Sequence, residues 1–267
     1  MSEAALPERD DCPVCGRTSR PYDCCDFNKN CEERHGHFVP LALRAVYYYR
    51  CAVCGFVYAP EFRSWSVREF QERIYNAEYP RFDPEFAESR PAANADMLAN
   101  TFAGWRERLR FLDYGGGDGA LAERLKAAGF DIGNHDPLYG HVQEEPEHGF
   151  HVVTAFEVFE HVPEPAEMLK DIVRFLRDDG LILFSTLISD GSIREGGRLT
   201  WWYAAPRNGH ISLFTQQSLR ILGDRLGLRT RSLGPGLHLY FRTLADWALP
   251  VFGIGGAGGD PRDRNPR

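Results

Sequence analysis

The chain has 267 residues, of which 43% are apolar and 26% charged, a composition typical of a soluble globular protein. A formal net charge of −7 argues against bulk attraction to nucleic acid, leaving only a local basic patch for such a partner. No apolar run reaches transmembrane length, and the amino terminus lacks the basic and apolar regions of a signal peptide. We therefore expect no membrane partner and a cytoplasmic location, with all seven cysteines outside disulfides.

Two short cysteine motifs lie in the first part of the chain. Cys12–Cys15 and Cys51–Cys54 each place two thiols three residues apart, and a glycine follows each pair. Four thiolates from two such turns are a common ligand set of structural zinc, which would replace a core that about 60 residues cannot build alone. We predict a zinc-ribbon-like module over residues 1–60, with reduced, metal-free turns as the alternative. Its expected ligands are Cys12, Cys15, Cys51 and Cys54.

Between the two motifs lie further thiols and imidazoles that do not form a second pair of motifs. Free side chains in a loop are favoured over additional metal ligands at these positions, although metal binding stays open. They are Cys24, Cys25, Cys31, His35 and His37.

Residues 61–108 are predicted to form a helical linker that covers a pocket as a lid. Ser66 followed by Glu69 is the pattern of a capped helix start, and residues 92–107 are again helical in pattern. Three side chains of this segment can reach a ligand. The alternative is that the two rings pack between helix and sheet while the arginine lies on the surface. These residues are Tyr75, Tyr79 and Arg90.

A glycine-rich turn is the strongest motif of the chain. The apolar run 109–112 ends in Asp113, and glycines at 115, 116, 117 and 119 enclose Asp118 before a helix pattern. Strand, glycine turn and helix form the core of a nucleotide-binding βα unit. A pyrophosphate at the helix start would be repelled by Asp118, whereas a ligand with an amino group and a sulfonium suits two acids. The turn therefore favours S-adenosylmethionine over NAD(P), with a purely structural βα loop as the alternative.

The next strand pattern ends in Asp136, followed by Pro137. An acid at this point is placed to accept hydrogen bonds from ribose hydroxyls, although Asp136-Pro137 can also be a simple turn. Residues 138–149 are short and polar and hold no obvious further βα unit. The usual third strand is therefore missing or reduced, and the adenine-binding residues stay unidentified.

Two more strands and a loop complete the predicted site. The strand 151–156 ends at Phe156 and Glu157, and 180–187 is a continuous apolar run expected to be central. The loop that follows reaches His210, whose near-neutral pKa in water suits a general base; the alternative is that it only holds the loop by hydrogen bonds. Residues 227–232 and 238–242 are expected to pair as an antiparallel hairpin, and the tail from 253 has a disordered composition.

These motifs together resemble the class I S-adenosylmethionine-dependent methyltransferases. The resemblance covers about residues 109–245, over half the chain, and rests on 113–119, 135–137, 156–161 and 180–186. A zinc-binding region before such a domain is similar to sugar C-methyltransferases and to some ribosomal-RNA methyltransferases. The run 206–215 also looks like the acceptor-side loop of bacterial small-molecule methyltransferases.

The resemblance implies an α/β fold with a Rossmann-like, seven-stranded mixed sheet that carries one reversed edge hairpin. It implies a methyltransferase domain over 109–245 with a small-molecule acceptor such as a sugar. The remaining segment, 246–267, is predicted from its composition to be a largely disordered tail. The alternatives are an RNA methyltransferase, an NAD(P)-dependent oxidoreductase and a non-catalytic adaptor; the oligomeric state is not indicated. The implied cofactor residues are Asp113, Gly115, Gly117, Gly119 and Asp136, with Phe156 and Glu157 near the methionine end.

Overall fold

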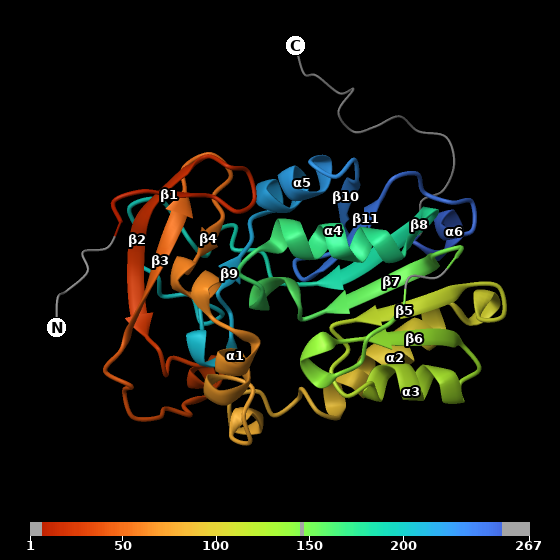
Figure 1. Ribbon diagram of the computed structural model, residues 1–267, viewed down its shortest axis with the longest axis horizontal. Helices are drawn as coiled ribbons and strands as arrows, with labels where there is room; N and C mark the ends of the chain where they lie inside the picture. Colours follow the sequence, from red (N-terminus) through yellow and green to blue (C-terminus); the bar gives the residue numbers. More distant parts are fainter. Residues whose placement is uncertain (1–6, 145–146, 253–267) are drawn as a thin grey trace, which may run out of the picture.

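Two β-sheets lie side by side in the computed structural model, which describes residues 7–144 and 147–252 (Figure 1). The smaller sheet contains the first strands of the chain, and the larger sheet has helices on both faces (Figure 1). Among the described residues, every helix is too short or too polar to cross a membrane. The segment 253–267, for which disorder was predicted, lies outside the described residues.

The larger sheet has the order β10-β11-β8-β7-β5-β6. β5 to β8 run parallel, while β11 pairs antiparallel with β8 and β10 pairs antiparallel with β11. The predicted α/β class and the reversed edge hairpin are therefore confirmed. The strands are β5 (Arg110–Tyr114), β6 (Asp131–His135), β7 (Phe150–Phe156), β8 (Leu176–Ser185), β10 (Arg229–Ser232) and β11 (Leu237–Phe241).

The expectation of seven strands is wrong for the described part of the chain, where this sheet has six. After β6 the chain forms only the short helix η5 (Pro137–Tyr139) and a bridge between Asp136 and His141. A further parallel strand beside β6 would need a crossover connection of a dozen or more residues. The segment between β6 and β7 is too short to hold both such a crossover and an additional strand. The predicted reduction of the third strand is thus confirmed.

Alternating side chains of the central strands give the larger sheet two cores. Phe111, Val152 and Leu181 pack with α2 (Ser89–Thr101) and α3 (Ala120–Ala127) on one face. Leu112, Val153 and Ile182 pack on the other face, with the helices α4 and α5. Apolar burial on both faces explains why β8 reads as a continuous hydrophobic run. The remaining helices of this region are α4 (Pro165–Phe175), α5 (Gln216–Asp224) and the short α6 (Ala248–Val251).

The smaller sheet joins the beginning of the chain to a segment far along it. Its order is β1-β2-β3-β4-β9, so a strand that follows the last parallel strand of the larger sheet completes it. Apolar side chains of this sheet, of residues 60–75 and of residues 193–211 share one core. The strands are β1 (Asp10–Asp11), β2 (Thr18–Asp26), β3 (Ala45–Cys51), β4 (Val57–Tyr58) and β9 (Ser212–Leu213).

The predicted helical linker consists of short helices and one longer helix. Ser66 caps α1 (Val67–Arg73) as predicted, because its hydroxyl accepts from the amide of Glu69 while the Glu69 carboxylate accepts from the amide of Ser66. α2 begins and ends earlier than the predicted span 92–107. Besides η5, the short 3₁₀ helices of the described chain are η1 (Cys31–His35), η2 (Pro60–Ser64), η3 (Tyr79–Arg81), η4 (Ala103–Trp105), η6 (Phe159–His161) and η7 (Pro206–Asn208).

Candidate functional site

The glycine turn after β5 has the backbone that only glycine adopts without strain. Gly115, Gly117 and Gly119 have φ values of +72°, +58° and +92°. Gly116 was not among the predicted site residues, and it needs glycine for a different reason. A Cβ there would lie 2.3 Å from the Asp113 carboxylate and from the Asn134 side chain. The turn is therefore pressed against the ends of β5 and β6.

Asp113 lies at the end of β5, only 3% exposed, and accepts a hydrogen bond of 2.7 Å from the Thr154 hydroxyl. Burial raises the pKa of Asp113 to about 7. No cation pairs with this carboxylate among the described residues, and it lines a cavity. Asp113 is therefore a buried group that a positively charged ligand could stabilise in its ionised form.

Asp136 lies at the end of β6 and holds the glycine turn. Its two carboxylate oxygens accept hydrogen bonds from the amides of Gly117, at 2.9 Å, and Leu138, at 3.0 Å. Burial raises the pKa of Asp136 above its ordinary value. Asp136 and Pro137 do form a turn, which was the alternative to a ribose-binding role. The Asp136 carboxylate nevertheless lines the same cavity as Asp113.

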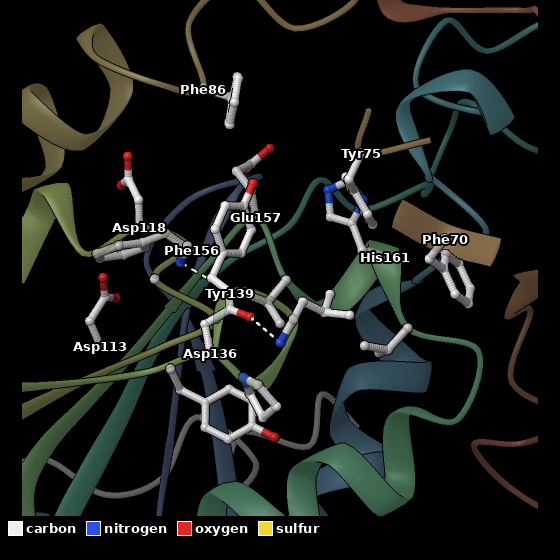
Figure 2. A pocket seen from close by; sticks show the side chains of 18 of the residues that line it. Phe70, Tyr75, Phe86, Asp113, Asp118, Asp136, Tyr139, Phe156, Glu157 and His161 are labelled. Carbon is white, nitrogen blue, oxygen red and sulfur yellow. Dashed lines mark hydrogen bonds between the residues drawn. The ribbon is translucent and has the colours of Figure 1, made fainter. Parts of the chain in front are cut away.

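A cavity of about 490 Å³ lies above the carboxyl ends of β5, β6 and β7. Figure 2 shows that the side chains around it come from these strand ends and from the linker helices, with Asp118, Asp136, Glu157 and Phe86 among them. Most of the predicted cofactor residues come together here. Those that line it are Asp113, Gly115, Gly117, Asp136, Phe156, Glu157 and Arg90. Gly119 stands just behind the turn, as the residue before α3.

Three residues of the linker segment, Tyr75, Tyr79 and Arg90, line the cavity. Tyr79 is buried, and the hydroxyl of Tyr75 lies 3.0 Å from Nδ1 of His161. Arg90 is not on the open surface: its guanidinium forms two hydrogen bonds, of 2.9 and 2.6 Å, with the carboxylate of Asp83. The sequence interpretation missed Asp83; the acid seven residues before Arg90, next to Pro84, was the available signal.

His210 does not line this first cavity but a second one, of about 410 Å³. The second cavity lies against η1, the segment 82–94 and the loop that ends at His210. Asp83, Arg90, Asn94 and Glu157 line both cavities. The two spaces therefore meet at these side chains.

The surroundings of His210 determine its protonation. Its Nδ1 lies 2.9 Å from the carbonyl oxygen of Tyr203, which can only accept, so Nδ1 carries the proton and Nε2 a lone pair. Burial lowers the pKa of His210 well below that of free histidine, and His161 lowers it further. The loop-holding hydrogen bond predicted as the alternative is present, and it also leaves Nε2 free to accept a proton.

Two buried groups next to His210 complete this region. Glu160 is 0% exposed and accepts a hydrogen bond from the hydroxyl of Tyr203, while its other oxygen lacks a partner among the described residues. Burial, followed by the nearby Glu157, raises the pKa of Glu160 well above its usual range. Burial lowers the pKa of His161 to about 4. Both residues belong to the predicted strand-end motif 156–161.

The four predicted metal ligands form one cluster. Their sulfur atoms all lie within 4.8 Å of one another, with Cys12–Cys54 at 3.6 Å and Cys15–Cys51 at 3.4 Å. A tetrahedral ion with Zn–S bonds of about 2.3 Å separates its ligands by about 3.8 Å, so the thiols fit such an ion.

The other cysteines and histidines of this region lie outside the four-sulfur cluster, but Cys24 and Cys25 belong to strand β2 and Cys31 to η1 rather than to a loop. Cys24 is exposed, and Cys31 is buried with its sulfur 3.5 Å from Nδ1 of His210. Cys25 is half-buried on β2, and His35 accepts a hydrogen bond from the Arg34 guanidinium. His37 is exposed.

Comparisons with known proteins agree with the arrangement of the site. A family model described as a methyltransferase domain matches residues 68–233. Among curated proteins, the chain is similar to the ubiquinone biosynthesis O-methyltransferases of Yersinia enterocolitica and Yersinia pestis, with 30% identity over 29% of this chain and 42% of each relative. The chain thus spans less than half the length of the curated relatives it matches.

Among solved structures, the chain is similar to DesVI of Streptomyces venezuelae, with a TM-score of 0.42, 15% identity, and coverage of 58% of this chain and 93% of that one. It is also similar to the plantazolicin methyltransferase BpumL in complex with SAH, with a TM-score of 0.44, 15% identity, and coverage of 71% and 89%. At these TM-scores and identities, neither likeness assigns an activity or an acceptor.

Proposed function

The chain belongs to the methyltransferase family whose domain model matches residues 68–233, and we propose that it transfers the methyl group of S-adenosylmethionine to a small-molecule acceptor. The observation that carries this proposal is the meeting of two cavities at the carboxyl ends of the parallel strands, one beside the glycine turn and one beside His210. The proposed acceptor class is a sugar or another metabolite with a hydroxyl, amine or carbon nucleophile.

The first cavity suits the cofactor because its charges match those of the ligand. Asp136, at the end of β6 and next to the glycine turn, accepts hydrogen bonds from the ribose hydroxyls. Asp113 faces the cationic part of the ligand, where an ionised carboxylate offsets the positive charge. Phe156, Glu157 and Arg90 lie toward the methionine end, and Arg90 offers a guanidinium that a carboxylate can share with Asp83. Gly115, Gly117 and Gly119 let the ligand lie against the backbone.

The reaction needs the two substrates close together and one proton removed. The acceptor's lone pair attacks the methyl carbon, the carbon–sulfur bond breaks, and its electron pair stays on sulfur. Holding the reactants in line supplies much of the rate. Nε2 of His210 takes the proton of a hydroxyl or amine acceptor, since its Nδ1 is already committed to Tyr203.

The four clustered thiols are proposed to hold a structural zinc ion. Four thiolates fill a tetrahedral shell, so the ion has no position for substrate and supplies no catalytic chemistry. The cysteines belong to a core that also contains Phe56, next to β4 of the smaller sheet, and Leu219 of α5. An ion here would therefore brace the smaller sheet against the methyltransferase domain.

Calorimetric titration tests the proposal directly. We expect micromolar or tighter binding of S-adenosylmethionine and of its demethylated product, no binding of NADH, and zinc in the purified protein. Asp136→Ala should weaken cofactor binding about 10- to 100-fold, since it removes two ribose hydrogen bonds to a charged group. Absence of binding by both cofactor forms would overturn the proposed function.

A further inference from the structure

Glu157 stands where the two cavities meet. It lines the first cavity together with the glycine turn and the second cavity together with Ser185 and His210. Gly115, Gly117 and Asp118 line only the first cavity. The second cavity is therefore separated from the glycine turn, and a group that passes between the two spaces passes Glu157.

The backbone of Glu157 is in an unusual conformation. Its φ is +52°, in the left-handed region that side chains other than glycine rarely adopt; among the described non-glycine residues, Leu43 alone shares a positive φ. Such conformations persist where the surrounding structure imposes them, and they concentrate at functional sites. The surrounding structure thus holds Glu157, at the junction of the two cavities, in a backbone conformation that a glutamate does not favour.

Ser185, at the end of β8, imposes this position through two reciprocal hydrogen bonds. The amide of Glu157 donates to the Ser185 hydroxyl oxygen at 2.8 Å, and that hydroxyl donates to Oε1 of Glu157 at 2.7 Å. No described residue donates a hydrogen bond to the second carboxylate oxygen, Oε2. Figure 2 shows the Glu157 side chain beside the cavity on the side of Phe86, Tyr75 and His161.

We propose that the second cavity is the acceptor site and that Oε2 of Glu157 binds the acceptor's nucleophilic hydroxyl or amine, with Ser185 as the positioning residue. This inference rests on the proposed methyl transfer and names its acceptor class. Three acids, Glu32, Glu85 and Glu157, line the second cavity. Of its two arginines, Arg90 is paired with Asp83, and only Arg34 has no carboxylate partner among the described residues. That balance favours a neutral or cationic polar acceptor over an anionic one.

The chemistry balances with the groups present. An amine acceptor points one N–H at Oε2 of Glu157 and another at Nε2 of His210, whereas a hydroxyl shifts its single hydrogen bond from Oε2 to Nε2 as it reacts. The acceptor's lone pair forms the new bond to the methyl carbon. The sulfonium loses the methyl group and becomes a neutral thioether, and the acceptor's proton passes to Nε2 of His210. Glu157 touches the reacting group, whereas Ser185 acts only through Glu157.

The first experiment identifies the acceptor by its chemistry. The purified full-length protein is incubated with deuteromethyl-labelled S-adenosylmethionine and a small-molecule extract of its source cells, and labelled products are found by mass spectrometry. We expect an O- or N-methylated product that is neutral or cationic. A labelled carboxylate ester, thioether or carbon product would overturn the inference. No labelled product together with no cofactor binding would instead mean that the proposed function itself fails.

The second experiment uses the acceptor so found. Glu157→Gln should lower kcat/KM for it about 10- to 100-fold, because an amide NH₂ replaces a charged hydrogen-bond acceptor, and this loss should exceed the loss of affinity for the demethylated cofactor. Ser185→Ala should act mainly on the acceptor KM, and Ser185→Thr, which keeps the hydroxyl, should restore it. Ser189→Ala, at a buried serine that lines neither cavity, should leave both constants unchanged. Unchanged kinetics in Glu157→Gln would refute the assignment.

A third measurement needs no acceptor. Glu157→Gly removes the backbone strain and also the hydrogen bond from the Ser185 hydroxyl to the carboxylate, while the backbone amide still donates to Ser185. The two effects are opposite and of similar size, so Tm should stay within about 2 °C of the parent. Leu43→Gly relieves the same kind of strain at an exposed site that lines neither cavity, and should leave methyl transfer unchanged. A fall in Tm of more than about 5 °C in Glu157→Gly would mean that Glu157 serves the fold, against the inference.

Discussion

The imidazoles of His161 and His210 lie edge to face, with their ring centroids 4.9 Å apart, although the first lines one cavity and the second lines the other. The two rings thus form part of the wall between the proposed cofactor and acceptor sites. Burial lowers the pKa of both residues, and two charged rings at this distance would repel each other. Both rings are therefore neutral near pH 7, and the pair can hold at most one transferred proton.

Replacing His210 should separate catalysis from cofactor binding. In His210→Ala we expect kcat to fall about 10²- to 10⁴-fold, the usual contribution of a general base, with little change in affinity for the demethylated cofactor. Steady-state kinetics and calorimetry measure the two effects. His37→Ala, at an exposed histidine outside both cavities, is the matched control. Full activity in His210→Ala would remove this residue as the base.

Cofactor binding should depend on pH through Asp113. Burial raises the pKa of Asp113 to about 7 without ligand, whereas a cationic ligand favours the carboxylate and lowers it. Binding should therefore release about one proton near pH 6 and almost none near pH 8, with affinity about tenfold lower at pH 6. Calorimetry in two buffers of different ionisation enthalpy measures the proton release.

The stability of the ligand-free protein should show the opposite trend. Because the folded pKa of Asp113 lies above its ordinary value of 3.8, the folded chain holds the extra proton and its stability falls as pH rises from about 4 to 7. Asp113→Asn should remove the Asp113 contribution and so reduce this slope, which Asp136 and Glu160 share, and it should remove most of the pH dependence of cofactor binding. Asp96→Asn, at an exposed residue of α2, should alter neither. Proton release that persists in Asp113→Asn would show that another group titrates.

Loss of one clustered thiol should remove the metal. In Cys51→Ser we expect zinc, measured by elemental analysis, to drop from about one ion per chain to near zero, with a lower Tm because Cys51 lies in the core beside α5. Cys24→Ser changes an exposed thiol outside the cluster and should keep both metal and stability. A parent protein free of metal that is equally stable with and without chelator would contradict the zinc assignment.

Lys29 should support the acceptor site from a distance. Its half-buried ammonium donates hydrogen bonds to the carbonyl oxygens of Trp201, at 2.9 Å, and Ala204, which hold the loop that leads to His210. Lys29→Met should remove both hydrogen bonds and leave the Ala204 carbonyl without this donor, destabilise the protein by about 1–3 kcal/mol and raise the acceptor KM, with cofactor binding unchanged. Chemical denaturation and kinetics measure both.

The control for this change is Lys170→Met on the exposed face of α4, where the ammonium pairs with Glu167. It should change the free energy of unfolding by less than about 0.5 kcal/mol, as expected for an exposed ion pair. Equal destabilisation by the two substitutions would mean that the hydrogen bonds of Lys29 are not what stabilises the loop.

Features determined by a few adjacent residues could be predicted from the sequence. The positive φ of Gly115 and Gly117, the cap at Ser66 and the two cysteine turns each depend on contacts within one turn of chain. Backbone sterics and short-range hydrogen bonds act over that same range. The closeness of the strand-end acids Asp113 and Asp136 could also be predicted, because the carboxyl ends of parallel strands meet at one edge of the sheet.

Only the tertiary structure decided how distant segments share space. β9 completes a sheet that begins at residue 10, and His210 lies in a second cavity behind His161 rather than with the cofactor residues. The left-handed backbone of Glu157 depends on Ser185, 28 residues away. Such features arise from long-range packing and hydrogen bonding, which override local preference and leave no periodic signal in the chain.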